Sequence, residues 1–129
     1  MYRFLREKIQ SDTMMSDIQV FKDDDKNPHY KGKYIAINCL PFSYGDNKVD
    51  GGVMNINLHC PRLISGGADR EALNKLFSFI SELIPFDDAT EDSDTLFLGG
   101  VHYVIKTQSR PMEDKDDTYF VNLRLKLTF

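Results

Sequence analysis

Apolar and polar side chains alternate along the segment 53–61, and we take this pattern as the centre of the fold. The apolar positions are Met54, Ile56, Leu58 and Cys60, and the polar positions are Asn55, Asn57 and His59. Successive side chains of a strand point to opposite faces of a sheet, so a period of two predicts a strand with one buried face. The other face is then solvated or covered by a partner.

A helical period follows in the segment 69–84. The apolar residues recur three and four positions apart, at Ala72, Leu73, Leu76, Phe77, Ile80, Leu83 and Ile84. This spacing places them on one face of an amphipathic helix. Asp69 is suited to cap the N-terminus of the helix, and Pro85 is suited to end it. We expect this helix to pack against the apolar face of the sheet.

The remaining segments complete the predicted fold. We expect an N-terminal helix within residues 1–15 and strands at 18–21, 34–40, 96–98, 101–107 and 119–129. Gly99-Gly100 forms the turn of a hairpin, and residues 43–52 and 109–117 have the composition of loops. The predicted fold class is α+β, with an antiparallel sheet of four or five strands packed against one long helix (69–84), an N-terminal helix alongside, and a single domain spanning 1–129.

The charge and the N-terminal sequence narrow the possible partners and location. The 129 residues carry 16 basic and 20 acidic side chains, which gives a net charge of -4. Binding through phosphate neutralisation needs a basic surface, so we expect no specific nucleic-acid partner. The first residues are charged where a signal peptide is apolar, and no apolar stretch approaches the ~20 residues that cross a bilayer. We therefore expect a soluble, cytoplasmic protein without a membrane partner, in which Cys39 and Cys60 are buried free thiols.

The sequence contains no arrangement of residues that predicts catalysis. His29, His59 and His102 lack the spacing of a helical zinc motif, and His59 and Cys60 face opposite sides of their strand because they are consecutive. The acidic clusters lack the spacing of a calcium-binding loop. The motifs of serine hydrolases and of phosphate-binding loops are absent. We therefore predict no enzymatic activity, no catalytic residue, no metal site and no cofactor.

The polar faces of two predicted strands remain as the candidate interface. Their residues are Asn55, Asn57, His59, Asn122, Arg124 and Lys126. Protein interfaces are about as apolar as the rest of a protein surface, so a polar row of this kind suits either solvent or a subunit contact. The sequence leaves both readings open.

The order of the predicted elements resembles the tail terminator, or tail completion, proteins of long-tailed bacteriophages and prophages. The resemblance covers nearly the whole chain and is a pattern of strands, not a chemical fingerprint. Its elements are an N-terminal helix, a strand, the strand Tyr34-Ile35-Ala36-Ile37-Asn38-Cys39-Leu40, the strand at 52–61, the helix opened by Asp69, a hairpin, and the final strand Tyr119-Phe120-Val121-Asn122-Leu123-Arg124-Leu125. The loops at 43–52 and 109–117 have no counterpart in this pattern.

The resemblance implies a structural protein and not an enzyme. Members of this family form a six-membered ring that caps the tail tube, stops its polymerisation and presents a surface to the head connector. The implied partners are other copies of this chain, the tail tube protein and the head–tail connector proteins. The implied location is the cytoplasm during assembly and then the virion tail. Two alternatives stay open: a small non-enzymatic binding or accessory module with an apolar pocket between helix and sheet, and, with less support, a metal-dependent hydrolase.

Overall fold

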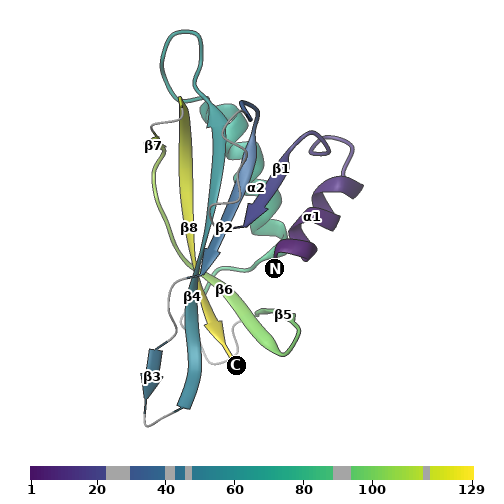
Figure 1. Cartoon of the computed structure of the whole chain (residues 1–129), viewed down its shortest axis with the longest axis vertical. Coiled ribbons are helices and arrows are strands. Elements are labelled where there is room, and N and C mark those ends of the chain that lie inside the picture. The colour runs from purple at the N-terminus through teal and green to yellow at the C-terminus, as the bar shows by residue number, and fades with distance from the viewer. Residues whose placement is uncertain (23–29, 40–42, 46–47, 89–93, 115–116) are drawn as a thin grey trace.

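The structure of this chain, a computed structural model, describes residues 1–22, 30–39, 43–45, 48–88, 94–114 and 117–129 (Figure 1). For residues 43–45 and 48–50 it describes only the backbone. The two helices are α1 (Tyr2–Ser11) and α2 (Arg70–Leu83). The strands are β1 (Gln19–Lys22), β2 (Tyr34–Cys39), β3 (Ser43–Gly45), β4 (Lys48–Pro61), β5 (Leu96–Leu98), β6 (Val101–Gln108), β7 (Met112–Glu113) and β8 (Thr118–Thr128).

The strands form one mixed sheet with β4 and β8 at its centre. Six strands follow the path β1-β2-β4-β8-β6-β5, while β3 pairs with β4 and β7 pairs with β8. β1 runs parallel to β2, and the other paired strands are antiparallel. Strands in a sheet twist relative to their neighbours in a constant sense. Across this sheet the curvature adds up to a half-barrel (Figure 1).

The prediction of an antiparallel sheet of four or five strands against one long helix is therefore wrong. The described chain has eight paired strands, and the pairing of β1 with β2 is parallel. β3 and β7 lie in the segments 43–52 and 109–117, which have loop composition, and backbone pairing to a longer neighbour holds them in place. The cover consists of two short helices, of 10 and 14 residues, which lie where the sequence predicts the N-terminal helix and the helix 69–84.

Both helices pack against the same face of the sheet. Leu5 and Ile9 of α1 belong to the same buried cluster as Leu73, Leu76 and Ile80 of α2. The central strands supply Ile35, Ile37, Met54, Ile56, Leu58, Cys60, Val121, Leu123, Leu125 and Leu127 to this cluster. Burial of a large aliphatic side chain stabilises the fold by roughly 1.5–3 kcal/mol. The alternation along β4 and β8 and the helical spacing along α2 thus converge on one core, as the sequence predicts.

The predicted helix cap and the predicted hairpin turn are both confirmed. Asp69 is the N-cap residue of α2, and its carboxylate accepts a hydrogen bond from the backbone N–H of Ala72 at 3.1 Å. This bond satisfies one of the N–H groups that a helix leaves free at its start. Between β5 and β6, Gly99 and Gly100 have φ values of 55° and 85°, which suit the tight turn of a hairpin.

Gly51 and Gly52 lie within strand β4, although the sequence predicts a loop at this point. Gly51 pairs with Thr128 of β8. A Cβ atom added at Gly51 would lie 2.6 Å from the backbone oxygen of Leu127. The close approach of the neighbouring strand therefore explains a glycine in the interior of a strand.

We expect Gly51→Ala to lower the free energy of unfolding by about 1–3 kcal/mol, because the added methyl group forces a shift of the backbone. Chemical denaturation of the two proteins measures the difference. The matched control is Gly67→Ala, since a Cβ atom at Gly67 meets nothing closer than Ser65 Oγ at 3.9 Å. An equal effect of both substitutions would contradict the close contact at Gly51.

Candidate functional site

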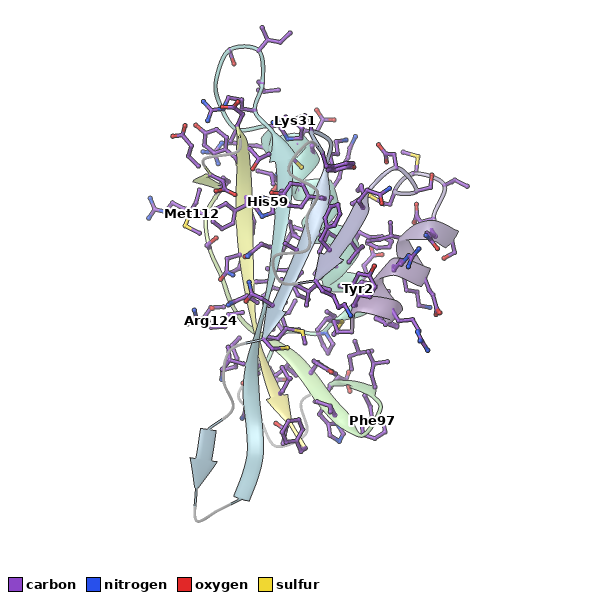
Figure 2. The ribbon with its side chains drawn as sticks, in the orientation of Figure 1. Tyr2, Lys31, His59, Phe97, Met112 and Arg124 are labelled. Atoms are coloured by element: carbon purple, nitrogen blue, oxygen red, sulfur yellow. The ribbon has the colours of Figure 1, made fainter. Side chains whose placement is uncertain are left out.

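The six predicted interface residues all lie on the face of the sheet opposite the two helices, which we call the distal face. Figure 2 labels His59 and Arg124 of this set. In the register of β4 with β8, Asn55 lies opposite Arg124 and Asn57 lies opposite Asn122. His59 is opposite Phe120, and Lys126 is opposite Val53. Residues opposite one another on adjacent strands point to the same face. The structure thus brings together two rows that are separate in the sequence.

Asparagine side chains form a hydrogen-bonded network at the centre of the distal face. Asn122 Nδ2 donates to Asn57 Oδ1 at 2.7 Å and to Asn55 Oδ1 at 3.2 Å. Asn55 Nδ2 in turn donates to Asn38 Oδ1 at 3.1 Å, and Arg124 Nε lies 3.5 Å from Asn55 Oδ1. All four asparagines are half-buried. This amide network links β2, β4 and β8 and holds the side chains in one arrangement, so they lose little freedom when a partner binds.

His59 belongs to the framework of the distal face. Only 5% of the residue is exposed. Its ring is stacked between Tyr34 and Phe120, with ring centroids 4.2 Å and 5.0 Å away. Its Nδ1 atom lies 3.2 Å from Thr118 Oγ1 and 3.7 Å from a carboxylate oxygen of Asp114. The stack lies at one end of the distal face and is buried there, whereas Arg124 on the same face is exposed.

The exposed charge on the distal face is positive at its centre. Arg124 and Lys126 are both exposed and project from alternate positions of β8. Towards the stacked end, the half-buried Asp114 brings a carboxylate oxygen within 3.7 Å of His59 Nδ1. The centre of the face therefore offers two cations and several amide groups, which suit the carboxylates and backbone carbonyls of a protein partner.

Sequence reasoning missed the residues that organise this face. Asn38 extends the network to β2, and Tyr34, Phe120 and Thr118 enclose His59. Each occupies an ordinary position in a strand, and only the register shows which side chains meet. The period of two does place Tyr34 and Asn38 on the same side of β2, but it does not show what lies opposite them.

The cysteines and acidic residues form no recognisable chemical site in the part of the chain that the structure describes. Within that part, no group of three His, Cys, Asp or Glu side chains is placed to hold a metal ion. Both cysteines are thiols, but only Cys60 is buried, so the prediction of a buried thiol is wrong for Cys39. Cys39 is the last residue of β2. His29 and the acidic residues 23–25, 91–92 and 116 lie outside the described residues.

Burial protects the second thiol from ionisation. Cys60 is fully buried in the core cluster, and this burial raises the pKa of its thiol to about 11, against a smaller lowering by Lys33. A thiolate, and not a thiol, attacks electrophiles. Cys60 therefore behaves as a small apolar core residue.

We expect Asn122→Ala to lower the free energy of unfolding by about 1–3 kcal/mol, because the oxygens of Asn55 and Asn57 lose their shared donor. Denaturant titration measures this change. Asn74→Ala is the matched control, since Asn74 is exposed on α2, and it should change stability by no more than about 0.5 kcal/mol. A neutral Asn122→Ala variant would show that the amide network contributes nothing to the fold.

We expect a thiol reagent at pH 8 to modify one cysteine per native chain, namely Cys39. With a pKa of about 11, roughly one Cys60 thiol in a thousand is ionised at that pH, and its burial blocks access. A Cys39→Ser variant should react only after denaturation. Rapid modification of the native Cys39→Ser protein would contradict the burial of Cys60.

In the described residues, neither helix combines the length and the apolar character that crossing a membrane requires. No protein-family model matches the chain, and no curated protein matches it either.

Proposed function

We propose that this chain is a structural assembly protein of the tail terminator type. Its copies form a ring that caps a phage or prophage tail tube and joins the tail to the head connector proteins. The observation that carries the proposal is the amide network of the distal face, together with the exposed cations beside it. A polar surface held in one arrangement suits a lasting protein contact better than it suits solvent alone.

The ordered amides favour a protein partner in particular. Each asparagine carries both donor and acceptor groups, which are the groups that bond to backbone and side-chain amides on another protein. Arg124 adds a guanidinium group that forms paired hydrogen bonds with a carboxylate. The distal face is therefore suited to a specific, directional contact.

The hairpin of β3 and β4 offers a second element for assembly. β4 pairs with β8 only as far as Gly51 and Thr128. The remainder of β4, from Lys48, pairs with β3 and projects beyond the rest of the sheet (Figure 1). A ring subunit needs two different surfaces, because each contact in a ring joins unlike patches of neighbouring copies. The projecting arm and the distal face supply such a pair.

The proposal is tested by electron microscopy and sedimentation velocity on the full chain, alone and mixed with tail tubes assembled from the tube protein of the same phage or prophage. We expect six-membered rings, free in solution or bound at tube ends, and a stop to tube growth. A protein that stays monomeric at high concentration and does not bind tube ends would refute the proposal.

Charge reversal of the distal face gives a sharper version of the same test. The double variant Arg124→Glu and Lys126→Glu should reduce ring formation or end binding, because both cations project from this face. Arg3→Glu with Arg6→Glu is the matched control on α1, where both residues are exposed. Equal loss in both double variants would point to a general charge effect and not to the distal face.

A further inference from the structure

Strand β1 forms one edge of the sheet (Figure 1). In the part of the chain that the structure describes, β1 pairs with β2 alone. The backbone N–H of Gln19 donates to the oxygen of Lys33, on the β2 side, at 3.4 Å. Alternate residues of a paired strand direct their backbone groups to opposite edges, so Val20 and Lys22 direct theirs away from β2. The outer edge of β1 therefore presents N–H and C=O groups of the kind that a further strand binds.

A polar hollow lies between this edge and helix α1. Its volume is about 260 Å³, and a single water needs only roughly 10–15 Å³. Strand β1 forms one wall. The other wall is a stripe of α1 with side chains four residues apart, Tyr2, Arg6 and Gln10. We call this space between β1 and the stripe of α1 the edge hollow; it has room for several residues of an added chain.

The charged side chains among the described lining residues of the edge hollow are both basic. Arg6 comes from α1 and Lys22 from the end of β1, and both are exposed. Lys22 Nζ lies 5.3 Å from the centre of the Tyr2 ring, so the lysine reaches from the strand to the helix. The hollow therefore presents two cations beside the backbone groups of the strand edge.

Two acidic residues adjoin lining residues in the sequence but do not line the hollow themselves. Glu7 follows Arg6 on α1, and Arg3, one turn before Glu7, carries the opposite charge. Asp17 lies near Tyr30, where burial and then the charge of Asp17 raise the pKa of the tyrosine hydroxyl. Within the described residues, the lining of the edge hollow is therefore positively charged.

We propose that the edge hollow binds an extended, acidic segment of a partner protein, which adds to the sheet as a strand beside β1. The outward backbone groups of Val20 and Lys22 pair with the main chain of the segment, and Arg6 and Lys22 bind its carboxylates. A small free anion would bind the cations but leave the strand edge without a partner, whereas an extended segment satisfies both. The inference goes beyond the proposed ring function and does not depend on it, because a single copy of the chain already presents the edge hollow.

Binding of a synthetic peptide to the full chain tests this inference. The probe is a fluorescein-labelled peptide of about six residues, the usual length of a strand, in which aspartate and valine alternate. We expect saturable binding by fluorescence anisotropy, and slower hydrogen exchange at the amides of Val20 and Lys22 in the complex. The same peptide with methylated backbone nitrogens should bind about tenfold more weakly or less, because it cannot donate to β1. Equal binding of the two peptides, or no binding of the first at millimolar concentration, would overturn the inference.

Charge reversal in the edge hollow tests the choice of an acidic partner. The double variant Arg6→Glu and Lys22→Glu should bind the aspartate peptide about tenfold more weakly or less, and should prefer a peptide with lysine in place of aspartate. Lys8→Glu with Arg70→Glu is the matched control, because both cations are exposed and neither lines the hollow. Equal loss of binding in the two double variants would show a general charge effect and would overturn the assignment of the site to the edge hollow.

Discussion

Strand β4 lies between β2 and β8, and its register with β8 decides which side chains reach the core. The pairing runs from Gly51 opposite Thr128 to Pro61 opposite Thr118. In this register Ile56 and Leu58 join the buried cluster, while Asn57 faces away from the helices. A slip of one residue would exchange the two faces and bury amide groups among aliphatic side chains. The packing of both helices on the sheet and the arrangement of side chains on the distal face therefore both depend on the pairing of β4 with β8.

Periodicity predicts the elements that bury a regular face. β2, the second half of β4, α2, the hairpin of β5 and β6, and β8 all lie close to their predicted positions. β3 and β7 carry no such signal, because they span three and two residues and are held by backbone bonds to longer neighbours. The strand count and the parallel pairing of β1 with β2 depend on contacts between distant segments, which local alternation does not encode.

The same limit applies to the candidate site. Alternation identifies Asn55, Asn57 and His59 as one row and Asn122, Arg124 and Lys126 as another. It does not show that Asn122 bridges two residues of the first row, nor that aromatic rings enclose His59. In the register of β4 with β8, the two rows form one surface, in which His59 is buried and the cations Arg124 and Lys126 are exposed. In the proposed ring, the distal face is the polar contact surface, and its ordered side chains give the contact its direction.

Nuclear magnetic resonance measures the register of β4 with β8 most directly, through nuclear Overhauser effects between backbone hydrogens of the two strands. We expect contacts between Asn57 and Asn122 and between Asn55 and Arg124, and slow exchange of the side-chain amide hydrogens of Asn122. A pattern shifted by one residue, with Asn57 opposite Leu123, would contradict this account, because it would place the asparagines among the residues of the core.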